Sequence, residues 1–114
     1  MVFTKDMLRA AYDMLETTEP FCRWNLPPSE DIEFAVTQNL RTKGRCLVGE
    51  GPIFKLEVSN KLHTYPTTMM ATLAHEMIHV YQAWTGIKFD DGKGFRVLAA
   101  EVCEAHGFDP GAFL

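Results

Sequence analysis

The stretch that decides the fold is His75-Glu76-Met77-Ile78-His79, an HExxH pattern inside the segment with the strongest helical periodicity. Each helical residue turns by about 100°, so His75 and His79 lie one turn apart on the same face. Two imidazoles placed in this way can bind one Zn²⁺. Glu76 lies beside that face, where a carboxylate can take a proton from zinc-bound water. The pattern therefore predicts a zinc site with Glu76 as general base.

The helix that carries this motif has clear predicted ends. Pro66 suits the first helical turn, and Gly86 suits the position just after the last turn. We therefore expect a helix from Pro66 to about Thr85. An apolar stripe lies roughly opposite the histidines and supplies a packing face: Met70, Leu73, Met77, Tyr81 and Trp84. Because packing is already provided for, the histidine pair is better explained by a metal than by the core.

The other elements follow from periodicity and from turn residues. Alternation of Phe54, Leu56 and Val58 with polar residues predicts a half-buried strand with one face in water. The chain is expected to form helices over Thr4–Thr17 and from near Asp91 to Gly107, and strands over Ile32–Thr37, Arg45–Val48 and Ile53–Ser59, the last two separated by the turn Gly49-Glu50-Gly51-Pro52. The grouping of strands apart from helices predicts an α+β fold, with residues 1–114 as a single domain.

Composition excludes several classes of protein. The chain has 114 residues, 46% of them hydrophobic, with a net charge of −4. These values are typical of a globular domain and argue against a strongly basic nucleic-acid binder. No apolar run is long enough to span a bilayer, and the N-terminus does not have the pattern of a secretory signal. Three sparse cysteines suit reduced thiols, so we expect a cytoplasmic protein without a membrane partner.

A third protein ligand is needed, because catalytic zinc usually takes three and a water. The apolar positions of the last helix turn Glu101 and Glu104 away from the core side. Asp91 and His106 lie about 22 Å apart along a helix, so they cannot share one ion. Asp91 could instead cap the helix, which is a common use of aspartate. Asp90, the preceding residue, is then an alternative third ligand. His106 alternatively suits a helix C-terminus.

The order of these residues resembles the SprT-like family of zinc metallopeptidases. The similarity covers about residues 32–108 and comprises the HExxH motif, Arg41-Thr42-Lys43-Gly44-Arg45, Phe54–Val58, Asp91-Gly92-Lys93-Gly94-Phe95, Ala99-Ala100-Glu101 and Gly107-Phe108. In that family the helix after the motif opens with HGxxF, and its histidine is the third ligand. This chain has Asp91 there. The resemblance therefore implies that His75, His79 and Asp91 hold one Zn²⁺, a ligand set similar to that of the aspzincin peptidases.

The resemblance also implies a fold and an activity. It implies a minimal zincin that hydrolyses peptide bonds through a zinc-bound water activated by Glu76, with a protein or peptide as substrate. It further implies that the strand Ile53–Ser59 lies at a sheet edge near the cleft and holds an extended peptide. Family members act on proteins bound to DNA, but the acidic balance of this chain does not support a nucleic-acid partner.

Two rival interpretations remain from the sequence. One is a catalytically inactive, zinc-stabilised module of the same fold that binds a protein, in which Asp91 has replaced the histidine at the cost of activity. The other is a structural protein without metal. Zinc content separates the second rival from the rest, and hydrolysis that depends on Glu76 separates a peptidase from the first.

Overall fold

The first helix, α1 (Lys5–Glu16), begins where the sequence predicts. The hydroxyl of Thr4 accepts a hydrogen bond from the backbone N–H of Met7 at 3.3 Å, which is the bond an N-cap residue makes. Two short 3₁₀ turns, η1 (Phe21–Arg23) and η2 (Ser29–Asp31), then lead to the sheet. The computed structural model describes residues 2–49, 54–63 and 65–113.

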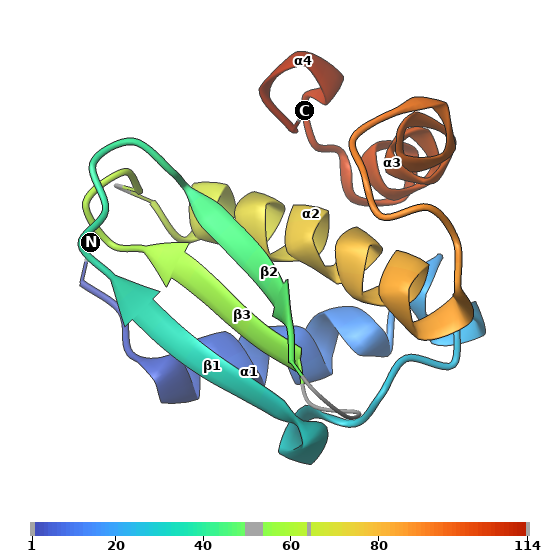
Figure 1. Ribbon diagram of the computed structural model, residues 1–114. Coiled ribbons are helices and arrows are strands. Elements are labelled where there is room, and N and C mark those ends of the chain that lie inside the picture. Colours follow the sequence, from blue (N-terminus) through green and yellow to red (C-terminus); the bar gives the residue numbers. More distant parts are fainter. Residues whose placement is uncertain (1, 50–53, 64, 114) are drawn as a thin grey trace.

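The sheet has three strands in the order β1-β3-β2 (Figure 1). They are β1 (Ile32–Thr37), β2 (Gly44–Val48) and β3 (Phe54–Ser59). The central strand β3 runs parallel to β1 and antiparallel to β2. The expectation that the third strand lies at an edge near the cleft is therefore wrong: the edge strand beside the longest helix is β2. Of the predicted turn 49–52 and of Ile53, all but Gly49 lie outside the described residues.

The expectation that β3 has one face in water is also wrong, because β3 is flanked on both sides. Glu57 and Ser59 are only 8% and 0% exposed. The carboxylate of Glu57 accepts a hydrogen bond from Arg45 of β2 at 2.9 Å. The Ser59 hydroxyl donates to the carbonyl of Asn39 at 2.6 Å. Neighbouring residues of the same chain thus supply the hydrogen-bond partners that water would supply to exposed side chains.

The motif helix, α2 (Pro66–Thr85), has both of its predicted ends. Pro66 occupies its first turn, and Gly86 follows it with φ 77°, a conformation that favours glycine. The helix is buried more evenly than the predicted stripe requires: His79 and Gln82 are buried on the histidine side, whereas Trp84 is 45% exposed. Together with α1, α2 covers one face of the sheet (Figure 1).

Two further helices, α3 (Lys93–His106) and the short α4 (Pro110–Phe113), lie on the side of α2 away from α1. The sequence predicted α3 but not α4. The core joins all the main elements through residues such as Tyr12, Leu56, Leu73, Met77 and Phe95. The architecture confirms an α+β fold. Cys22, Cys46 and Cys103 are free thiols. No helix in the described part of the chain has the length and apolarity needed to cross a bilayer.

Candidate metal centre

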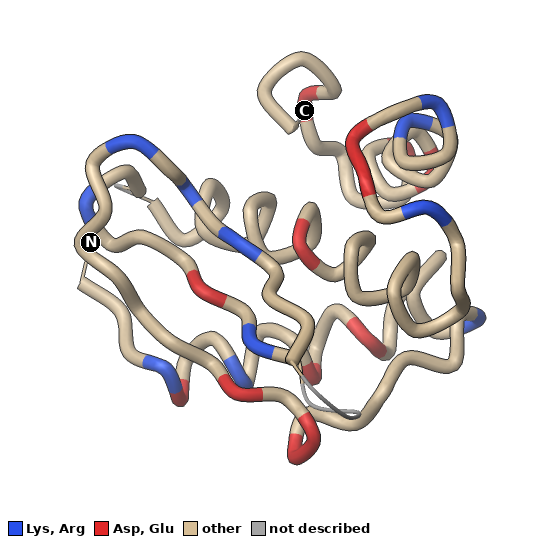
Figure 2. Tube along the Cα trace, viewed as in Figure 1, with Lys and Arg blue, Asp and Glu red and all other residues tan. Residues whose placement is uncertain are grey.

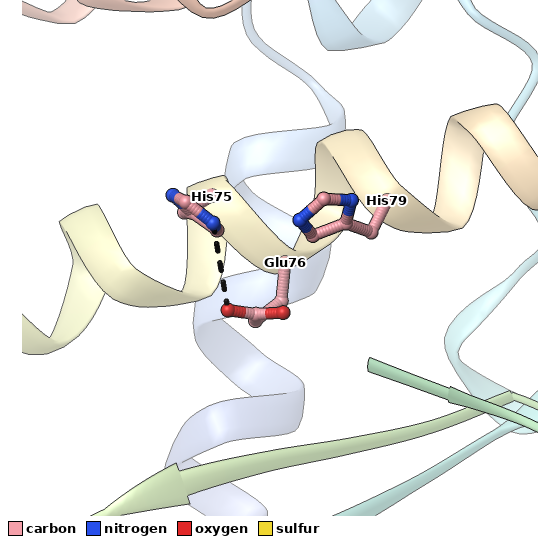
Figure 3. A group of neighbouring side chains, drawn as sticks. All are labelled: His75, Glu76 and His79. Atoms are coloured by element: carbon pink, nitrogen blue, oxygen red, sulfur yellow. Dashed lines mark ion pairs between the residues drawn. The ribbon is translucent and has the colours of Figure 1, made fainter. Parts of the chain in front are cut away.

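Helix α2 places three side chains with metal-binding atoms together. One ligand atom from each of His75, Glu76 and His79 lies within 4.8 Å of the others (Figure 3). Glu76 and His79 are 6% and 7% exposed, and His75 is half-buried. The two imidazole rings are 5.2 Å apart between centroids, one helical turn from each other. The helical spacing alone therefore builds this part of the site, as the sequence predicts.

Asp91 reaches the same site from the segment between α2 and α3. Its Oδ1 lies 2.9 Å from Nε2 of His79 and 3.8 Å from Nε2 of His75. Its side chain is 72% exposed, so it closes the site from the solvent side. Helix α3 begins at Lys93, and its N-cap residue is Gly92 rather than Asp91. The alternative that Asp91 serves as the helix cap is therefore wrong.

The other candidate ligands are engaged elsewhere. The side chain of Asp90 accepts a hydrogen bond from the backbone N–H of Gly92 at 3.0 Å, and its Oδ2 lies 3.2 Å from Nζ of Lys88. His106 lies 3.0 Å from the hydroxyl of Thr18, between Nε2 and Oγ1, and stacks on Phe108. Of the three candidates Asp90, Asp91 and His106, only Asp91 thus lies at the histidine pair.

Hydrogen bonds on the far side of each ring orient the two histidines. Nδ1 of His75 lies 2.8 Å from the backbone carbonyl of Phe113, in α4. Nδ1 of His79 lies 2.8 Å from Oε1 of Gln82. Both partners are acceptors, so each Nδ1 carries the proton and each Nε2 offers its lone pair to the site. Gln82 in turn donates to the carbonyl of Asp90 at 3.2 Å, which ties α2 to the segment that carries Asp91.

These orienting groups were missed by sequence reasoning for different reasons. Gln82 lies on the histidine face of α2, three residues after His79, and its position was the available signal. Phe113 acts through its backbone carbonyl, which every residue possesses, so no signal in the sequence could have identified it.

The electrostatics of the site fit a divalent cation. Burial raises the pKa of Glu76 to about 8, and the negative charge of Asp91 adds to the shift. Burial also lowers the pKa of His75, which favours the neutral, metal-binding imidazole. Two carboxyl groups and two imidazoles thus face one small space. A cation there would offset the repulsion between the carboxylates, and the nitrogen and oxygen donors are those that zinc accepts.

Comparison with known proteins agrees with this geometry. The model of the SprT-like family matches residues 11–111. This chain belongs to the SprT-like family. The match spans α2, α3 and the segment that carries Asp91. No significant match was found among curated proteins or among solved structures.

In this SprT-like chain the edge strand β2 lies against α2 beside Glu76, the candidate general base. A Cβ atom at Gly44 would meet Cγ2 of Thr72 at 2.7 Å and Cγ of Glu76 at 3.4 Å, so only glycine permits this close approach. A cavity beside the site is lined by residues of β2, α2 and the following segment, including Gly44, Cys46, His75, Glu76, His79, Phe89 and Asp91. Strand β2 therefore forms one wall of the cleft that contains the metal centre.

Cys46 borders this cleft as a neutral group. It lies opposite Leu56 of β3, on the face of the sheet that the helices cover. Burial and the nearby negative charge of Glu76 raise the pKa of the Cys46 thiol to about 12. A thiol with so high a pKa is neither a ready nucleophile nor a ready metal ligand.

Proposed function

We propose that this chain is a zinc metallopeptidase that hydrolyses peptide bonds in a protein or peptide substrate. The single observation that carries the proposal is the cluster of His75, Glu76 and His79, with Asp91 against both Nε2 atoms. Nε2 of His75, Nε2 of His79 and the carboxylate of Asp91 would hold the ion. Two imidazoles and one carboxylate are a ligand set of catalytic zinc, which leaves a position for water or substrate.

Glu76 is the residue for proton transfer. When bound, Zn²⁺ supplies Lewis-acid chemistry, lowering the pKa of a water molecule to about 7 and polarising the substrate carbonyl. The carboxylate of Glu76 lies next to the ligands, with Oε2 4.0 Å from Nε2 of His75. It accepts a proton from the attacking water and passes it to the nitrogen of the leaving amine. Water and one peptide bond thereby yield one carboxyl group and one amine.

The free edge of β2 supports a polypeptide substrate. The backbone N–H of Ser59 donates to the carbonyl of Lys43 at 2.8 Å, which makes these two residues a hydrogen-bonded pair. In an antiparallel ladder such pairs alternate, so the N–H and C=O groups of Gly44 and Cys46 point away from β3. Both residues line the cleft. An extended peptide can pair with these groups, which brings its backbone to Glu76.

Charge argues for a protein or peptide rather than a nucleic acid as the direct ligand. Figure 2 shows basic residues along the segment that leads into β2 and at the start of β2. The residues there are Arg41, Lys43 and Arg45. The guanidinium of Arg45 is paired with Glu57 at 2.9 Å, and the chain as a whole is acidic. A short basic segment with one charge already paired is weak support for binding a phosphate backbone.

The decisive experiment compares the parent with Glu76→Gln, which has nearly the same shape. Both zinc-loaded proteins are incubated with unfolded protein and with a peptide library, and products are identified by mass spectrometry. We expect the rate to fall by at least about 100-fold, the scale of a lost general base, while zinc content is unchanged. Glu104→Gln, an exposed position on α3, is the matched control and should keep the parent rate.

The outcomes separate the peptidase from its rival. An undiminished rate in Glu76→Gln would remove Glu76 from the reaction and point to a contaminating enzyme. A parent that carries zinc and binds peptides but cleaves none of them would favour the inactive binding module.

A further inference from the structure

A second cavity adjoins the metal centre on the His75 side. The cleft at His75, Glu76 and Asp91 extends to Lys43, Ala112 and Phe113. The same three residues, Lys43, Ala112 and Phe113, also line a groove between α2 and α4. The groove has a volume of about 260 Å³, slightly below the usual range of pockets for drug-sized ligands. It is therefore a continuation of the cleft rather than a separate depression.

The walls of this groove, which we call the α2–α4 groove, are mainly apolar. Ala71 lines it from α2, and Phe108, Ala112 and Phe113 line it from the segment after α3 and from α4. Thr67 and Thr68 lie at its far end. The hydroxyl of Thr68 donates to the carbonyl of Tyr65 at 2.8 Å, so its hydrogen-bonding capacity is partly used within the chain. Such walls suit an apolar group better than a charged one.

The position of the groove relies on the helical spacing of α2. Ala71 lies four residues before His75, so the groove begins one helical turn, about 5.4 Å, from the first histidine. Phe113 contributes a wall of the groove and also the carbonyl that orients His75. A side chain bound there would thus belong to a residue close to the bond held at Glu76.

We propose that the α2–α4 groove is a specificity subsite that binds a large apolar side chain, such as Leu, Phe or Met, of a substrate residue next to the scissile bond. The proposal rests on the proposed peptidase function and names the substrate class for that site. The occupant follows from continuity: the free edge at Gly44 leads an extended peptide past Glu76 to Lys43, at the mouth of the groove. The backbone stays on β2 while one side chain turns into the groove.

The test fills the groove from its far end with Thr68→Trp. Thr68 is exposed and does not line the cleft at Glu76, so the indole occupies the groove without altering the metal centre. Thr17→Trp is the matched control, because Thr17 is also exposed and its hydroxyl also donates to a carbonyl three residues earlier. The first readout is binding: each change is combined with Glu76→Gln, and a randomised peptide library is selected for retention without cleavage. The second readout is cleavage: the parent, Thr68→Trp and Thr17→Trp, all with Glu76 intact, are incubated with the library and their products are sequenced.

We expect retained peptides and cleavage products to favour large apolar residues at one fixed position beside the scissile bond. Thr68→Trp should lower affinity for those peptides by about tenfold or more, since burying a large apolar side chain is worth about that factor. It should shift the preference to small residues and leave zinc affinity unchanged. Thr17→Trp should match the parent in both readouts.

Three results would overturn the proposal or locate its error. Cleavage without an apolar preference at any position, or with a preference that Thr68→Trp leaves intact, refutes the subsite and leaves the peptidase standing. If apolar peptides are retained, Thr68→Trp abolishes that retention and the parent cleaves nothing, the groove is supported and the peptidase is refuted. A dimer of the parent that Thr68→Trp dissociates would make a second copy of the chain the occupant and refute the substrate assignment.

Discussion

His75 and His79 occupy equivalent positions on α2, yet different parts of the chain hold them. The ring of His79 is oriented by Gln82, three residues later on the same helix. The ring of His75 is oriented by the carbonyl of Phe113, 38 residues later in α4. Half of the site is therefore built by one helix, and the other half depends on the packing of the last helix against it. The difference separates what a local pattern can specify from what only the folded chain supplies.

The largest effect on zinc binding is expected when either histidine is removed, and it should be the same for both. His75→Ala and His79→Ala should each abolish tight zinc binding, because only two of the three proposed ligands remain. Elemental analysis of protein prepared without chelator should give about one zinc per parent chain and almost none in either variant. His106→Ala is the control and should keep its zinc, since His106 contacts Thr18 outside the site. A parent that holds less than about a tenth of an equivalent after added Zn²⁺ would contradict the metal site.

The next effect concerns Asp91, the proposed ligand that lies in the segment between α2 and α3. Asp91→Asn removes the charge of a proposed direct ligand and should lower zinc affinity by more than about 100-fold, beyond the range for loss of an outer hydrogen-bond partner. Asp91→His introduces the residue that the family has at this position and should retain zinc. Because the N-cap of α3 is Gly92, neither change should alter the melting temperature of the metal-free protein appreciably.

Chelator competition measures the affinities, with Asp90→Asn as the control. The side chain of Asp90 contacts Gly92 and Lys88 and should be dispensable for zinc. Equal zinc affinity in the parent and in Asp91→Asn would exclude Asp91 from the ligands.

The smallest effect tests the orienting groups themselves. Gln82→Leu removes the acceptor for His79, and deletion of residues 110–114 removes the carbonyl of Phe113. Each should weaken zinc binding by about 10- to 100-fold, as loss of a ligand's hydrogen-bond partner does. Gln82→Glu keeps the acceptor for His79 but loses the donor to the carbonyl of Asp90, so it should recover only part of the loss. The metal-free melting temperature must first show that the shortened chain is folded.

Combining the two changes sharpens the comparison. The groups act on separate rings and share no partner, so their free-energy effects on zinc binding should add. A double variant no weaker than either single variant would mean that the two rings are held by one common element.

The parts of the molecule that the sequence predicted are those that short-range patterns determine. Pro66 and Gly86 mark the two ends of α2, and Thr4 marks the start of α1. His75, Glu76 and His79 follow from helical spacing within one turn. Of the two orienting groups that escaped, one is Gln82, a local contact on the same helix, and the other depends on a tertiary contact. The carbonyl of Phe113 is the clearest case, because nothing distinguishes one backbone carbonyl from another until the chain is folded.

The errors concerning the sheet have the same origin. Alternation in Phe54–Ser59 was interpreted as one dry and one wet face, which holds for many antiparallel sheets. The order β1-β3-β2 instead places this strand in the centre, where Glu57 meets Arg45 and is shielded from water. A strand's own residues carry little information about which strands flank it. The strand at the edge of the cleft is therefore β2 and not the predicted β3.

The exposure of Asp91 has a consequence for how a metal ion would enter and leave the proposed site. The side chain of Asp91 is 72% exposed, whereas both histidine rings pack against Phe95, which belongs to the buried apolar layer. An ion can therefore arrive and depart across the outer surface while that layer remains closed. Loading of the proposed metal would then be an event in the finished fold, governed by the supply of ions around the protein, and would not have to coincide with the moment at which the chain folds.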